Sequence, residues 1–154
     1  YFQLGRTLQL LGRHEPAEKA YRQALQLYER LVAEHPQLPA YRQELAGTHN
    51  NLGNLLRATG RAAEAEKAYR QALQLFERLV AEHPQLPQYR VELARTLAGL
   101  GVLYSTQGKT EEALPQLEHA RKILRDVVQK HPELVGAQQL LNLVEVFYRG
   151  LGGK

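Results

Sequence analysis

The chain has 154 residues, a net charge of +4, and no cysteine, methionine or tryptophan. The absence of cysteine excludes disulfide bridges, cysteine-ligated zinc and a thiol nucleophile, and fits a reducing, cytoplasmic location. No apolar run approaches the roughly 18 residues that a membrane-spanning helix needs, so we expect no membrane partner. The missing methionine suggests a piece of a longer protein, and the opening Tyr1–Gln3 resembles the remnant of a cleavable tag.

One stretch recurs along the chain at a spacing of 48 residues. The sequence LVAEHPQLPAYRQELA at 31–46 returns at 79–94 as LVAEHPQLPQYRVELA, with a looser echo, VVQKHPELVGAQQLL, at 127–141. Between 13–48 and 61–96 only seven positions differ. A fixed period of this length indicates stacked repeats with neighbour contacts and no single closed core.

Each repeat is predicted to contain two helices. In the middle copy the first runs over Ala40–Thr59 and the second over Ala62–His83, because apolar residues recur at helical spacing in both. Gly60 follows the first helix as a left-handed cap. The sequence HPQLP ends the second helix and starts the next, since proline biases its preceding residue away from helix and suits the first helical position.

Glycine also occurs inside the predicted first helices, at Gly5, Gly53 and Gly101. A glycine there costs about 1 kcal/mol relative to alanine. We therefore expect a close approach of the partner helix at these three positions.

The repeat predicts one domain over 1–154. Its parts are a partial repeat at 1–38, full repeats at 39–86 and 87–134, a closing element from Pro132 to Arg149 with its capping helix at 135–149, and a flexible tail at 150–154.

Charged residues of opposite sign are interspersed, and many lie one helical turn apart. A nucleic-acid partner would need basic residues gathered on one face, so none is expected. The ion pairs expected on helix surfaces are Glu18 with Arg22, Arg30 with Glu34, Glu66 with Arg70 and Arg78 with Glu82.

The residue inventory argues against an enzyme. Ser105 is the only serine and Asp126 the only aspartate, and neither a nucleophile elbow nor a phosphate loop accompanies them. His35, His83 and His131 occupy the same hinge position in successive repeats, so we expect them beside helix ends and not in a metal site. Thr110 is expected to cap a helix whose first turn holds Glu111 and Glu112. We expect no metal, no cofactor and no small-molecule substrate.

Stacked helix pairs form a superhelix whose first helices line a concave groove. An amide side chain can hold a peptide backbone as donor and acceptor, and an arginine can bind an acidic group or a terminal carboxylate. The alternative is that the polar residues of the groove are ordinary solvated side chains or that the asparagines form a ladder between repeats. The residues predicted to line the groove are Arg6, Gln9, Gln43, Asn50, Asn51, Asn54, Arg57, Arg95 and Val102. Val91 and Ser105 also lie on this face of the third copy.

These repeats resemble the tetratricopeptide repeat (TPR) family. The pattern is Leu-Gly, a large residue, a loop glycine, and Ala-x-x-x-aromatic. It is matched by Leu4-Gly5, Leu8, Gly12, Ala17, Tyr21 and Ala24, and by Leu52-Gly53, Leu56, Gly60, Ala65, Tyr69 and Ala72. The third copy has Leu100-Gly101, Tyr104, Gly108, Ala113, Leu117 and Ala120, with leucine in place of the aromatic residue.

The resemblance implies an all-α, right-handed solenoid of three helix-turn-helix repeats with a C-terminal capping helix. The period of 48 exceeds the family's usual 34, and longer repeats of this kind are similar to those of kinesin light chains and bacterial regulatory TPR arrays. We therefore expect a protein-interaction module that binds an extended acidic or mixed peptide in its groove. The alternative is a structural scaffold that associates with itself through its solenoid ends.

Overall fold

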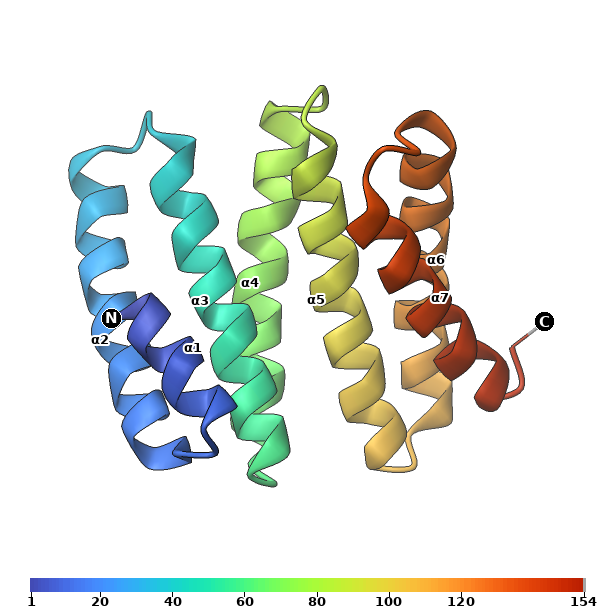
Figure 1. The fold of residues 1–154 in the computed structure, drawn as a ribbon, viewed down its shortest axis with the longest axis horizontal. Helices are drawn as coiled ribbons and strands as arrows, with labels where there is room; N and C mark the ends of the chain where they lie inside the picture. The colour runs from blue at the N-terminus through green and yellow to red at the C-terminus, as the bar shows by residue number, and fades with distance from the viewer. Residues whose placement is uncertain (154) are drawn as a thin grey trace. The chain divides into compact units, whose positions relative to one another are not determined.

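The computed structural model describes residues 1–153, which form seven α-helices and no β-strand. The helices fall into two compact units, Tyr1–Leu79 and Val80–Lys154, with the boundary inside α4. The all-α prediction is confirmed. The first unit contains α1 (Phe2–Leu10), α2 (His14–Glu34), α3 (Pro39–Ala58) and most of α4 (Ala62–Glu82), and the second contains α5 (Pro87–Thr106), α6 (Thr110–Lys130) and α7 (Val135–Gly150) (Figure 1).

Consecutive helices within each unit run antiparallel and form hairpins (Figure 1). The short turns after α1, α3 and α5 each contain a glycine with positive φ: Gly12 at 71°, Gly60 at 77° and Gly108 at 72°. The amide of Gly60 donates to the carbonyl of Arg57, and the next amide, of Arg61, donates to Leu56. These bonds satisfy the last carbonyls of α3, so the predicted left-handed cap is confirmed.

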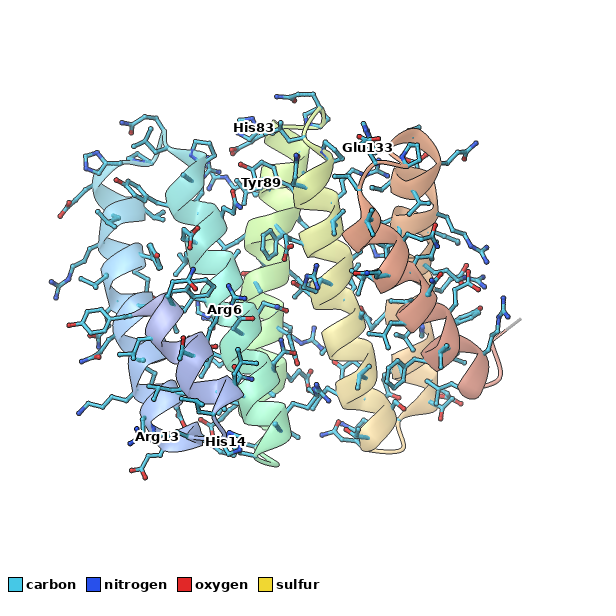
Figure 2. The ribbon with its side chains drawn as sticks, viewed as in Figure 1. Arg6, Arg13, His14, His83, Tyr89 and Glu133 are labelled. Carbon is cyan, nitrogen blue, oxygen red and sulfur yellow. The ribbon has the colours of Figure 1, made fainter. Side chains whose placement is uncertain are left out.

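The HPQLP hinge ends one helix and begins the next, as predicted. Pro39 is the first residue of α3, one residue before the predicted start at Ala40, and Pro87 is the first residue of α5, as predicted. Both prolines follow a leucine in extended conformation. The hinge histidines lie at helix ends, and two of them pack on aromatic rings, whereas His131 lies 3.3 Å from Glu133. His35 contacts Tyr41, and His83 contacts Tyr89, with ring centroids 5.9 Å apart in both cases (Figure 2 labels the second pair).

The helical glycines mark close helix contacts, as the sequence predicts. A Cβ added at Gly5 would lie 2.7 Å from the Tyr21 ring, and one at Gly53 would lie 2.9 Å from the Tyr69 ring. At Gly101 the neighbour is Leu117, whose Cγ would be 2.8 Å away. The second helix therefore presses a large side chain onto the glycine of the first helix, and a methyl group there would clash.

Two details differ from the predictions. Thr110 is not an N-cap: Lys109 occupies that position, Thr110 is the first residue of α6, and no side chain caps the helix. The residues at 132–134 form a turn before α7, because the HPEL sequence repeats the earlier hinge. The predicted surface pairs Glu18 with Arg22 and Glu66 with Arg70 are formed, at 2.7 and 2.8 Å.

Candidate functional site

The predicted binding residues lie on the first helices of the hairpins, α1 and α3 in the first unit and α5 in the second. Their side chains fall into three classes of solvent exposure. Arg6, Gln43 and Arg95 are exposed, whereas Gln9, Asn51, Asn54, Arg57, Val102 and Ser105 are half-buried, and Asn50 and Val91 are buried.

Asn50 corrects one expectation from the sequence. Packing was expected to leave this side chain free, but it is only 4% exposed. The reason is that α3 contacts α1 and α2 and also receives the Tyr69 ring of α4, so its buried surface is wider than the single stripe that the pattern predicts. A buried amide cannot hold a peptide that lies on the surface.

Asn54 and Arg57 contact a buried tyrosine. Tyr69, fully buried on α4, donates its hydroxyl proton to Asn54 Oδ1 at 2.7 Å and accepts a bond from Arg57 Nε at 3.4 Å. Burial raises the pKa of Tyr69 above its ordinary value, although the Arg57 guanidinium opposes the shift. These two side chains therefore satisfy a hydroxyl that would otherwise be buried without a partner.

The first hairpin repeats this arrangement with a different amide. Tyr21, also fully buried, donates its hydroxyl proton to Gln9 Oε1 at 2.8 Å. Burial raises the pKa of Tyr21 to about 12, against the field of Arg6. Gln9 is thus a structural partner of Tyr21 as well as a binding candidate.

The third hairpin has neither the tyrosine nor its polar partners. Leu117 occupies the tyrosine position, while Val102 and Ser105 stand where Asn54 and Arg57 stand in the middle copy. The three positions change together because an apolar side chain leaves no hydroxyl to satisfy. The predicted site did not include these tyrosines, although their pairing with polar residues in two of three copies is visible in the sequence.

The second unit has a pocket beside Arg95. It has a volume of about 270 Å³ and lies between α5 and the turn that begins α7. Val91, Leu134 and Ala137 supply apolar wall, and Glu133 lies in the same turn (labelled in Figure 2). The guanidinium of Arg95 stands at this pocket, 3.3 Å from Glu92. This arrangement offers an apolar cavity with an exposed cation at its side.

The first unit has a polar cavity that does not include the predicted binding residues. It measures about 300 Å³, lies between α2, α3 and α4, and includes His49, which is 6% exposed. Burial lowers the pKa of His49 to about 4, so the ring is neutral at pH 7, and its Nδ1 has no hydrogen-bond partner. Nearby, Arg61 binds Glu18 and Glu64 at 2.6 Å and so ties the start of α4 to α2.

The titratable side chains of the described residues form ion pairs and not a metal site. Within residues 1–153, no group of three or more His, Cys, Asp or Glu side chains could hold a metal ion. Asp126 forms ion pairs with Arg90 and Lys130, at 2.6 and 2.9 Å. None of the helices formed by these residues is long and apolar enough to span a bilayer.

Comparisons with known proteins agree with the fold. The chain is similar in structure to the crystal structure of BtubC (BKLC) from P. vanneervenii, with a TM-score of 0.65 and 20% sequence identity. That alignment covers 100% of this chain and 64% of BtubC, so this chain spans less than two thirds of that protein. The search of curated proteins found no match.

Two family models match the sequence itself. Both carry the description tetratricopeptide repeat, one over residues 44–126 and the other over residues 3–37. The first alone covers more than half of the chain, and the matched residues include the cap glycines and the helical glycines described above. The chain therefore belongs to the tetratricopeptide repeat family.

Proposed function

We propose that this protein is a non-catalytic interaction module that binds an extended acidic or mixed peptide along its first helices. Tetratricopeptide repeats generally mediate protein–protein interaction or scaffolding, and their helical fold is typically non-enzymatic. The observation that carries the proposal is the pocket between α5 and the start of α7, where an apolar wall lies beside the exposed Arg95.

The chemistry of this pocket favours a peptide with an apolar residue next to a carboxylate. The apolar side chain would fill the cavity against Val91 and Ala137, and the carboxylate would replace Glu92 as the partner of Arg95. In the first unit, Arg6 and Gln43 are exposed on α1 and α3 and are available to a peptide bound to that unit. Asn54, Arg57 and Gln9 contribute less than the sequence predicts, because tyrosines already occupy them.

The test is a display library of short peptides enriched in Asp and Glu, selected on the protein and then measured individually by fluorescence anisotropy. Replacing Arg95 by Glu should weaken a selected peptide roughly tenfold or more, because a charge-assisted bond becomes a repulsion. The matched control is Lys122→Glu, which makes the same charge change on an exposed position of α6. Equal losses in both variants would reduce the effect to net charge and reject the site.

The alternative function, a scaffold that associates with itself, is supported by a different observation. Helix α7 exposes Val135, Leu143, Val146 and Phe147, with exposed fractions of 36 to 70%. An apolar face of this kind is typical of contact with another protein or another copy. Light scattering over a range of protein concentrations distinguishes the two functions: a mass that rises with concentration and returns to the monomer value in Leu143→Arg favours the scaffold.

A further inference from the structure

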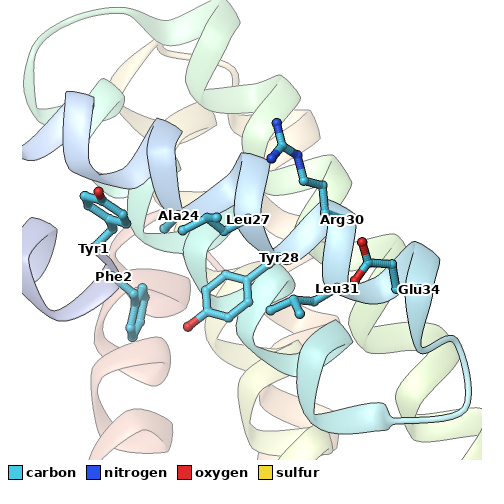
Figure 3. Close-up of a pocket in the computed structure, with 8 residues that line it drawn as sticks. All are labelled: Tyr1, Phe2, Ala24, Leu27, Tyr28, Arg30, Leu31 and Glu34. Atoms are coloured by element: carbon cyan, nitrogen blue, oxygen red, sulfur yellow. The ribbon is translucent and has the colours of Figure 1, made fainter.

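Two pockets of the first unit are similar in size but differ in the partners of their polar groups. The pocket in Figure 3 measures about 340 Å³ and lies along α2, with Phe2 of α1 at one end. The Tyr28 hydroxyl in this pocket donates to Glu44 Oε2 at 3.4 Å. In the cavity of about 300 Å³ between α2, α3 and α4, by contrast, Nδ1 of His49 is buried without a partner. The second cavity therefore has a buried polar group that a ligand can satisfy.

The fold itself does not require a histidine at position 49. The corresponding residue 48 positions later is Leu97, which is 3% exposed on α5. A leucine at this place has no polar atom to satisfy, whereas His49 brings a neutral imidazole to the cavity wall. A neutral imidazole has one nitrogen without a proton, which accepts hydrogen bonds. The cavity thus offers an acceptor to a ligand that carries a donor.

The rest of the lining favours an uncharged and largely apolar ligand. Two cations, Arg22 and Lys67, are balanced by two carboxylates, Glu29 and Glu64, so the formal charges of the lining cancel. Arg22 and Glu64 are already held in ion pairs at 2.7 and 2.6 Å. An apolar body with one hydroxyl group therefore suits the cavity better than an ion does. The apolar wall consists of Leu25, Leu52, Leu56 and Ala68.

The third hairpin indicates which apolar body fits. Its counterpart of Leu56 is Tyr104, which is 5% exposed and whose ring centroid lies 5.8 Å from Lys109 Nζ. The counterpart of Lys109 is Arg61, which binds Glu64 in the lining of the cavity. The third hairpin therefore buries a phenol ring at the position where the middle copy has a smaller leucine.

We propose that the cavity between α2, α3 and α4 binds a phenol group, whose ring packs on Leu52 and Leu56 and whose hydroxyl donates to His49. An aromatic ring with one polar end matches an apolar wall with one acceptor. Tyrosines of this chain are held in the same way, since Tyr69 donates to Asn54 at 2.7 Å. The cavity belongs to the first unit and Arg95 to the second, so this inference is independent of the proposed function.

The experiment titrates the whole protein with N-acetyltyrosinamide and with N-acetylphenylalaninamide, two ligands that differ only in the hydroxyl group. Chemical shifts in NMR spectra should move for His49, Leu52 and Leu56. We expect a dissociation constant of about 1–10 mM for the tyrosine derivative, because a ligand of this size makes few contacts. The phenylalanine derivative should bind about fivefold more weakly, because it leaves the histidine without a donor.

Two variants that copy the third repeat test the two parts of the site. His49→Leu removes the acceptor, as in Leu97, and should abolish the preference for the tyrosine derivative. Leu56→Tyr places the ring of Tyr104 in the cavity and should weaken both ligands roughly tenfold or more. The matched control is Leu27→Tyr, the same substitution at an exposed position of α2 outside this cavity. Circular dichroism establishes that each variant is folded, and the two ligands test the unmodified protein if Leu56→Tyr is not.

The source of the phenol group is resolved by a third ligand, 4-methylphenol. Tighter binding of the tyrosine derivative than of 4-methylphenol would identify a tyrosine of a peptide as the ligand, and the reverse order would identify a free phenol. Equal affinity for the tyrosine and phenylalanine derivatives, an unchanged preference in His49→Leu, or no saturation at about 30 mM would each overturn the proposal. The partner of His49 would then be water alone.

Discussion

Helices α3 and α5 are equivalent first helices with different interiors. At the position where α3 has His49, α5 has Leu97, and where α3 has Asn50 and Asn54, α5 has Ala98 and Val102. The buried neighbour changes accordingly, from Tyr69 on α4 to Leu117 on α6. The same backbone is therefore packed once with hydrogen-bonded polar groups and once with aliphatic groups, which fits the principle that buried polar groups need partners or must be replaced together.

The largest effect should follow from removing the aromatic ring of the α3 interior. Tyr69→Ala deletes a fully buried side chain that packs on Gly53, and should lower the free energy of unfolding by about 3–5 kcal/mol. Urea denaturation followed by circular dichroism measures the change. A loss below about 2 kcal/mol would mean that the cavity collapses easily and that the Tyr69 contact is not central.

Acid should destabilise the α3 interior through His49. The unfolded chain takes up a proton near the ordinary pKa of 6.5, whereas the folded chain does so only near 4. Stability is thus complete above pH 6.5 and falls as the pH drops toward 4, by about 2 kcal/mol at pH 5 and about 3 kcal/mol in all. Unfolding free energies at pH 7 and pH 5 test this.

The matched variant for this test is His49→Leu, which copies Leu97 of α5. It should abolish the loss between pH 7 and pH 5, a range above the titration of carboxylates such as Glu18, whose pKa is lowered by its arginine partners despite burial. An unchanged pH dependence in His49→Leu would assign the acid sensitivity to another group.

Converting the aliphatic interior into the polar one should show that the polar residues act together. Leu117→Tyr alone places a hydroxyl against Val102, and should destabilise by about 2 kcal/mol because the hydroxyl lacks a partner. Adding Val102→Asn should restore at least about 1 kcal/mol. The double-mutant cycle, completed with Val102→Asn alone, is measured by urea denaturation, and additive effects would contradict the coupling.

The smallest change removes one hydroxyl from the polar interior. Tyr69→Phe keeps the ring but leaves Asn54 Oδ1 without its donor, and should cost about 1 kcal/mol. Tyr21→Phe, which breaks the bond to Gln9, should give a similar loss. Calorimetric melting of both variants checks the result, and unchanged melting temperatures would show that water replaces the lost partners.

Much of the architecture followed from residues with strong local preferences. The positive φ of Gly60, the helix starts at Pro39 and Pro87, and the close contacts at the three helical glycines were all predictable. Each depends on the residue itself or on a partner 16 residues later, on the next helix of the same hairpin. The predicted cap at Thr110 was wrong because α6 already begins at this residue, so that Lys109 occupies the N-cap position.

The candidate site was less predictable. The clustered asparagines of α3 suggested a polar surface, yet Asn50 is buried and Asn54 is bonded to Tyr69. The pocket beside Arg95 is lined by residues of α5 and by residues about 40 positions later in the sequence. A local sequence pattern therefore does not predict it. Periodicity shows which side of a helix is apolar, but not how many neighbours cover it.

The sequence by itself determined the repeat, the helix pairs, the turns and the family, because a 48-residue duplication imposes the same local preferences and the same contacts on each copy. Only the tertiary structure decided which polar residues remain available for a partner. Their availability depends on the distance to side chains on other helices, as with Asn54, which accepts a hydrogen bond from the Tyr69 hydroxyl.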